Sequence, residues 1–368
     1  MAHFFATFRR LRRWHIAALA VLLSLALLGG CASLGYYGQS VNGQVEVLKS
    51  RRSVQAVIDD PATDERLRAR LRLALRIRAF ATHELHLPDN DSYRTYADLG
   101  RPYVAWNVVA TPEFSLEPMT WCFPVAGCVE YRGYFDRAEA EKFAAGLRRD
   151  GYDVLVGPVP AYSTLGWFDD PLLNTMMSWP EPELAGVIFH ELAHQRLYVS
   201  DDTTFNESFA VAVEREGVRR WMAAESRGKE YEAFRSRKRR NAQFVDLAMQ
   251  VRGELRALYA RDLNANEKRA EKQALFSWMR EEYARLKDEW GGYGGYDAWM
   301  SRPLNNARLA SLASYHEYLP AFRTLLESGD HDLRRFYASA KALAALPAPE
   351  RQARLAALLP PVVADAGS

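Results

Sequence analysis

The segment VIFHELAHQRLY, residues 187–198, carries two histidines four positions apart, with a glutamate directly after the first. Residues four apart share one face of a helix, so His190 and His194 can present two imidazoles to one metal ion. Glu191 lies beside them, where a carboxylate can accept a proton from a water molecule in the site. The segment therefore predicts a helix that begins near Pro180 and carries a catalytic metal site. A buried helix face with hydrogen-bonded histidines is the alternative.

The segment that follows, DDTTFNESFAVAVEREG, supplies a candidate third ligand. It predicts a second helix that starts near Thr203 and has Glu207 in its first turn. Catalytic zinc sites use three protein ligands and keep a fourth position open, so we expect Zn²⁺ to be bound by His190, His194 and Glu207. Glu214 shares a helix face with Glu207. We expect it to orient a ligand histidine through the other ring nitrogen.

Residues 1–30 have the layout of a secretory signal peptide, with four arginines, an apolar run and small residues before Cys31. The apolar run is short for a membrane span. The sequence LGGC that ends at Cys31 resembles a bacterial lipobox, in which the cysteine is lipidated after cleavage, and Ala32 favours the outer membrane. We therefore expect an outer-membrane lipoprotein that faces the periplasm. An uncleaved signal anchor is the alternative.

The charge balance of the mature chain is close to neutral. The leader contains four of the 48 basic residues and none of the 46 acidic ones. Nothing in this balance indicates a nucleic-acid partner or a polybasic membrane patch. The expected partners are a peptide substrate and, through the lipid anchor, the membrane.

Two cysteines remain once Cys31 is assigned to lipid, namely Cys122 and Cys128 in the segment WCFPVAGCVEY. An oxidising periplasm favours a disulfide between them. The short loop contains Pro124 and Gly127, which suit a tight closed turn, although sequence spacing does not show that the two Cβ atoms meet. Two free buried thiols are the alternative, and a zinc pair is disfavoured because partner cysteines are absent from the sequence.

The hydrophobic periodicity predicts a mostly helical α+β fold with a small mixed β-sheet and a helical C-terminal part. The predicted segments are a signal peptide at 1–30, an N-terminal helical segment of two packed helices at 31–100, a small α/β sheet unit at 101–179, a helical part with the zinc site at 180–359 and a tail at 360–368. The glycine-rich stretch GGYGGY is the conspicuous interruption of the helical part.

Several motifs resemble known zinc peptidases. The sequence NESFA at residues 206–210, followed by VE at 213–214 and Gly217, resembles the N-E-x-F-A…V-E-x-x-G stretch of the gluzincin aminopeptidases, in which the first glutamate is the third zinc ligand. The lipobox and the segments WCFPVAGCVEYRGYF, HELAHQ, FNESFA and NNARLASLASYHEYLPAF resemble the landmarks of a bacterial group of predicted zinc aminopeptidase lipoproteins. The resemblance spans most of the mature chain and implies a zincin-like catalytic domain.

Two features depart from the classical aminopeptidases. The interval between the second histidine and the glutamate is shorter here, and no G-x-M-E-N signature precedes the zinc helix. Because Glu214 lies at a spacing closer to that of thermolysin-like enzymes, it is the alternative third ligand to Glu207.

The resemblance also implies residues for the remaining catalytic tasks. Related enzymes stabilise the oxyanion with a tyrosine or histidine from a later helix, so Tyr315 in SYHEYLPAF is a catalytic candidate beside Glu191; a core tyrosine is the alternative. An aminopeptidase must also bind a free ammonium group. Asp169 and Asp170 in GWFDDPLLN are candidates for substrate binding, and a solvated turn explains them equally well.

The leading hypothesis is a zinc-dependent aminopeptidase that trims periplasmic peptides. A zinc endopeptidase acting on envelope proteins would share every zinc residue and differ only in whether the cleft is closed at one end. A non-catalytic envelope lipoprotein with a vestigial site is disfavoured by the intact base Glu191. A structural zinc site is disfavoured because such sites usually close with cysteine or histidine.

Overall fold

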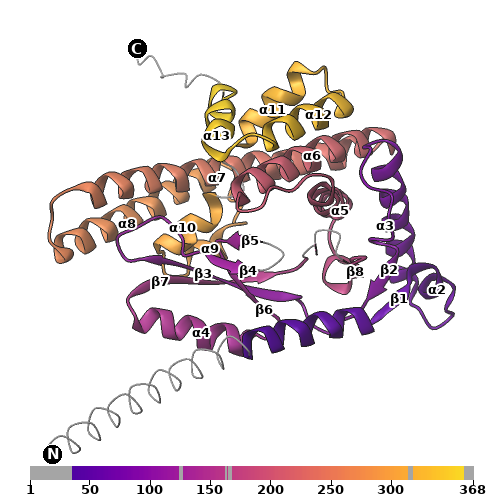
Figure 1. The fold of residues 1–368 in the computed structure, drawn as a ribbon, viewed down its shortest axis with the longest axis horizontal. Helices are drawn as coiled ribbons and strands as arrows, with labels where there is room; N and C mark the ends of the chain where they lie inside the picture. Colours follow the sequence, from indigo (N-terminus) through magenta and orange to yellow (C-terminus); the bar gives the residue numbers. More distant parts are fainter. Residues whose placement is uncertain (1–34, 124–126, 162–163, 165–167, 314–317, 360–368) are drawn as a thin grey trace, which may run out of the picture.

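The computed structural model describes residues 35–123, 127–161, 164, 168–313 and 318–359. The chain is mostly helical, with two three-stranded sheets and a two-stranded hairpin, which confirms the predicted α+β fold (Figure 1). Across these described residues, none of the helices combines the length and the apolar character that a membrane span needs. The division of the chain into five segments stays a prediction.

The N-terminal segment differs in detail from the two helices expected there. A helix covers residues 35–49. It is followed by elements of very different length, namely β1 (Arg51–Ser53), α2 (Val54–Asp59), α3 (Glu65–His83) and β2 (Thr95–Ala97). The hydrophobic pattern does not predict the strands β1 and β2, because three residues are too few to show a period of two. The Asp64 side chain caps α3 by accepting a hydrogen bond from the Leu67 amide at 3.0 Å.

The sheets are small, with two or three strands each. A mixed sheet has the order β1-β2-β8, in which β8 (Leu172–Leu173) pairs parallel with β2 and precedes a 3-10 turn at Asn174–Met176. An antiparallel sheet has the order β6-β3-β7, formed by β6 (Arg132–Tyr134), β3 (Ala105–Pro112) and β7 (Tyr152–Val159). Helix α4 (Arg137–Arg149) packs on this sheet through Ala140 and Ala144.

A disulfide joins Cys122 to Cys128, as the sequence predicted. The two cysteines face each other across the hairpin of β4 (Trp121–Phe123) and β5 (Gly127–Val129). Gly127 has a φ of +72°, a left-handed conformation that glycine adopts without strain.

Helices make up nearly all of the described chain after residue 180. They are α5 (Glu181–Arg196), α6 (Thr203–Ala224), α7 (Gly228–Ala260), α8 (Ala265–Glu289), α9 (Asp297–Met300), α10 (Asn306–Ala313), α11 (Leu319–Ser328), α12 (Leu333–Ala344) and α13 (Ala348–Ala357). Helices α7 and α8 form a long antiparallel pair that projects from the body (Figure 1). The glycine-rich stretch lies in the turn between α8 and α9, where Gly291 and Gly292 have positive φ.

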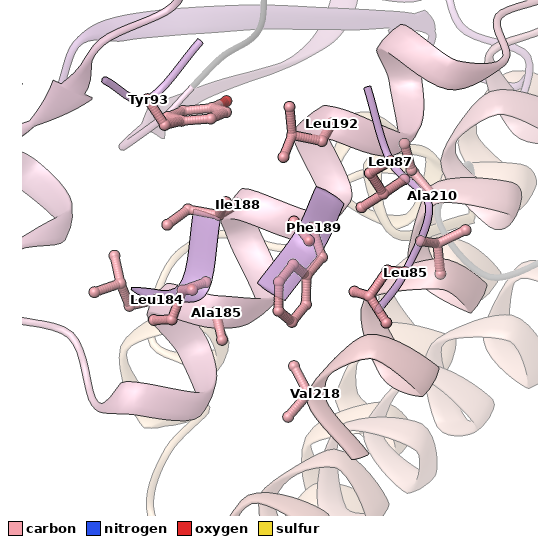
Figure 2. Close-up of a cluster of buried hydrophobic side chains, with 14 of the residues drawn as sticks. Leu85, Leu87, Tyr93, Leu184, Ala185, Ile188, Phe189, Leu192, Ala210 and Val218 are labelled. Carbon is pink, nitrogen blue, oxygen red and sulfur yellow. The ribbon is translucent and has the colours of Figure 1, made fainter. Parts of the chain in front are cut away.

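Helix α5, which carries the histidine motif, passes through the centre of the largest hydrophobic core. Ile188, Phe189 and Leu192 on this helix are fully buried, and side chains of α6 and of the segment that follows α3 surround them (Figure 2). Gly217 on α6 allows the close approach, because a Cβ atom there would lie 2.6 Å from Cδ2 of Phe189. Burial on most sides leaves α5 little freedom to move, so its polar residues are held in fixed positions.

Candidate metal centre

The loop between α5 and α6 brings the two helices side by side and antiparallel. Asn206 closes this loop, since its side chain accepts a hydrogen bond from the Val199 amide at 2.8 Å and donates one to the Val199 carbonyl at 2.7 Å. Asp202 caps α6 by accepting from the Phe205 amide at 3.0 Å, and it also pairs with Arg351 of α13. The start of α6, which carries Glu207, is therefore tied down from several directions.

His190, His194 and Glu207 form a group that could bind a metal ion. The two Nε2 atoms of the histidines lie 3.2 Å apart. Oε2 of Glu207 lies 3.3 Å from Nε2 of His190, and Oε1 lies 3.7 Å from Nε2 of His194. Ligands at zinc's usual bond lengths lie about 3.3 to 3.6 Å apart in a tetrahedral site. One donor atom from each of the three residues lies within 4.8 Å of the others, close enough for the three side chains to bind one ion.

The contacts of the histidine ring nitrogens also fit a metal. Two Nε2 atoms that face each other at 3.2 Å direct their lone pairs or protons at one point. On the other side of the ring, Nδ1 of His190 lies 3.4 Å from Oε2 of Glu214. A carboxylate in this position favours a proton on Nδ1 and leaves Nε2 free to bind a metal. Glu207 thus faces the metal-binding nitrogens of both histidines, whereas Glu214 faces the opposite nitrogen of one.

Glu214 has a cationic partner of its own. Nζ of Lys238 on α7 donates a hydrogen bond to Oε1 of Glu214 at 2.6 Å. Burial alone would raise the pKa of Glu214, but Lys238 and His190 outweigh it and hold the pKa well below its usual range. Gly186 leaves room for this side chain, because a Cβ atom there would lie 3.3 Å from Cγ of Glu214.

Glu191 occupies a different electrostatic environment from Glu207. Burial, reinforced by the nearby carboxylates of Glu207 and Asp170, raises the pKa of Glu191 to about 7 in the metal-free protein. Burial also lowers the pKa of His194 to about 4, so that its imidazole is neutral at neutral pH. A carboxyl group with a pKa near neutrality can both accept and release a proton, as a general base that later acts as an acid must do.

These residues open into a cavity of about 340 Å³ between α5, α6, the N-terminal helix and the sheets. His190, Glu191, His194 and Glu207 form its polar wall. The remaining wall is largely apolar and aromatic and is formed by Tyr36, Ala105, Phe123, Val129, Tyr131, Tyr134, Phe135, Val159, Ala161 and Tyr198, with Ser40, Asn107, Gly133, Thr203 and Asn206 among them.

The other residues predicted from the sequence lie in different places. Asp169 is exposed. Asp170 is buried, where its carboxylate accepts hydrogen bonds from the Thr164 amide at 2.9 Å and the Thr164 hydroxyl at 2.8 Å. Neither aspartate belongs to the described wall of the cavity. Cys31 and Tyr315 lie outside the described residues.

Sequence reasoning missed several residues of the centre. Tyr131 and Asn107 line the cavity from the sheet unit, far from the histidine motif in sequence, and local spacing carries no signal for them. Lys238 lies 24 residues after its partner Glu214 on another helix. Tyr198 lies just beyond the end of α5, and its ring centroid lies 6.4 Å from that of His194.

Comparison with known proteins assigns the chain to a family. The model of the family described as "Putative aminopeptidase" matches residues 35–355. The chain belongs to this family. Its description supports a peptidase function, in agreement with a glutamate that lines the same cavity as a candidate metal site. The comparisons found no match among curated proteins and no match among solved structures.

Proposed function

We propose that this member of the putative aminopeptidase family is a zinc-dependent aminopeptidase of the bacterial periplasm, anchored to the outer membrane as a lipoprotein. One observation carries the proposal. His190, His194 and Glu207 each place a donor atom within 4.8 Å of the other two, and Glu191 lines the same cavity. The donor set of two imidazoles and one carboxylate, with an open side toward a cavity, is typical of catalytic zinc.

The residues of the chain divide the chemistry among them. Zinc, when bound, supplies a Lewis acid that polarises the scissile carbonyl and makes water more acidic. Glu191 accepts a proton from the attacking water and passes it to the leaving amine. Glu214 and Lys238 orient His190, and the apolar wall excludes bulk water, which strengthens each electrostatic interaction in the cavity.

The proposed location depends on other features of the chain. The leader with Cys31 supports lipidation and export. The disulfide between Cys122 and Cys128 supports an oxidising compartment, because such bonds are rare in the cytosol.

A zinc endopeptidase is the second candidate, and the wall of the cavity favours it on one point. An aminopeptidase binds the ammonium group of its substrate with carboxylates. Among the described residues of this wall, only Glu191 and Glu207 are acidic, and both already have roles at the metal.

Pairs of peptides that differ only in acetylation of the N-terminus separate these candidates. We expect the chelator-sensitive protein to hydrolyse the free peptides and to leave the acetylated ones intact, with Glu191→Gln as the inactive control. Cleavage of both at internal bonds would establish the endopeptidase instead. Absence of chelator-sensitive hydrolysis of any peptide would overturn the proposal.

A further inference from the structure

Peptide hydrolysis is assisted by a hydrogen-bond donor to the oxyanion, a role that none of the described residues at the metal and the base fills. Attack by water places negative charge on the former carbonyl oxygen, and fixed donors that face this oxygen lower the barrier. Within the described wall of the cavity, four tyrosines are candidates, namely Tyr36, Tyr131, Tyr134 and Tyr198.

Tyr131 differs from the others in its place in the cavity. It lines the metal-site cavity and also a second cavity of about 260 Å³, and the two share Asn107, Tyr131, Val159, Ala161 and Thr203 in their walls. Its side chain is 36% exposed because it stands at this junction. A peptide bound across both cavities would pass over Tyr131.

The backbone around Tyr131 is held firmly. It follows β5, whose Cys128 is joined by the disulfide to Cys122, and it precedes β6, which pairs with β3. The amide of Cys128 also donates a hydrogen bond to Oδ1 of Asp201 at 2.6 Å, which ties the hairpin to the loop between α5 and α6. Tyr131 lies in the short connection between these two paired strands, so its backbone is restrained on both sides, and a donor held in place is preorganised in the way that transition-state stabilisation requires.

The protonation state of Tyr131 suits a hydrogen-bond donor. Desolvation in the cavity raises the pKa of Tyr131, and the carboxylates of Glu207 and Glu191 raise it further. The hydroxyl therefore stays protonated at neutral pH and can donate a hydrogen bond within the cavity that Glu191 and Glu207 also line.

We propose that Tyr131 is a catalytic residue whose hydroxyl donates a hydrogen bond to the oxyanion of the tetrahedral intermediate. The assignment rests on the proposed peptidase function and places the donor on the sheet unit instead of a later helix. Tyr131 keeps its proton throughout, so it lowers the energy of the intermediate without taking part in the proton transfer from water to the leaving amine.

The test compares Tyr131→Phe with Tyr134→Phe and Tyr315→Phe in the full chain purified in detergent. Tyr134→Phe is the matched control, because it removes a hydroxyl from the same cavity wall three residues away. We expect Tyr131→Phe to lower kcat by about 10²- to 10³-fold, with KM and zinc content nearly unchanged. We expect this loss of kcat to exceed the losses caused by the two other variants.

A second readout does not depend on turnover. A phosphinate peptide, which mimics the tetrahedral oxyanion, should bind zinc-loaded Tyr131→Phe about 10- to 100-fold more weakly than wild type, the scale of one hydrogen bond to a charged group. Calorimetry measures this difference.

Unchanged kcat and unchanged phosphinate binding in Tyr131→Phe would overturn the assignment, as would an equal loss in Tyr134→Phe. A loss confined to Tyr315→Phe would transfer the role to that residue. If the wild type hydrolyses no peptide but binds the phosphinate through Tyr131, the donor role stands and the peptidase function fails.

Discussion

Nδ1 of His190 lies 3.4 Å from Oε2 of Glu214, on the side of the imidazole opposite to Glu207. This contact distinguishes the two glutamates that the sequence offers as metal ligands. Glu207 faces the Nε2 atoms of both histidines, whereas Glu214 receives a hydrogen bond from Lys238 at 2.6 Å. A side chain already bound to a lysine and facing Nδ1 is placed to orient a ligand, not to act as one.

The first prediction compares these glutamates by substitution. Glu207→Gln removes a charged oxygen from a three-ligand site and should leave little zinc bound after dialysis. Glu214→Gln should retain zinc with an affinity lower by about 10- to 100-fold, the usual effect of losing a partner of a ligand histidine. Zinc titration of both variants measures the difference. The reverse order of affinities would make Glu214 the ligand, as the thermolysin-like spacing suggests.

The second prediction concerns the base. Glu191→Gln keeps the size of the side chain but cannot accept a proton, so turnover should fall by about two or more orders of magnitude. Zinc content should stay at about one ion per chain, because Glu191 is not among the three grouped donors. Metal analysis and peptide hydrolysis on the same sample check both parts. Full activity in this variant would show that the motif is not the catalytic one.

The histidine motif and the fold class could be predicted because both depend on local spacing. Helix period places His190 and His194 on one face, and the apolar pattern identifies long helices wherever they occur. The cavity wall opposite the metal could not be predicted. Tyr131 is placed in this wall by strand pairing and by the disulfide hairpin that precedes it. Lys238 contacts Glu214 from a third helix. Such contacts depend on how elements pack, which a single sequence does not reveal.

The third prediction tests the close approach of α5 and α6. A Cβ atom at Gly217 would lie 2.6 Å from Cδ2 of Phe189 and 2.7 Å from Cδ1 of Leu85. Gly217→Ala should therefore lower the free energy of unfolding by about 1 to 3 kcal/mol, the usual cost of overpacking. Gly253→Ala is the matched control, because Gly253 is an exposed residue of α7 and an added Cβ atom there would have no atom within 4 Å. It should raise stability by about 0.5 to 1 kcal/mol.

Chemical denaturation of the wild type and both glycine variants gives these values. A Gly217→Ala protein as stable as Gly253→Ala would show that the two helices are not packed as closely as described.

The fourth prediction concerns the anchor. Cys31→Ala removes the residue that the lipobox would lipidate, so the protein should leave the membrane fraction. Fractionation of cells that express the wild type and this variant measures the change, and a Cys122→Ser variant serves as a control for loss of a cysteine elsewhere. Retention of Cys31→Ala in the membrane would point to an uncleaved signal anchor.

The fifth prediction connects the disulfide to catalysis. Replacing both Cys122 and Cys128 by serine removes a short covalent loop and should lower the free energy of unfolding by about 2 kcal/mol. Zinc content should remain normal, because the metal ligands lie on α5 and α6. Peptide hydrolysis should fall, because Tyr131 follows Cys128 by three residues and loses its fixed backbone. Under denaturing conditions, wild-type protein isolated from cells should react with a thiol reagent at these positions only after reduction. Labelling of both cysteines without reduction would contradict the disulfide. Normal hydrolysis by the double serine variant would show that the hairpin holds Tyr131 in place without the disulfide.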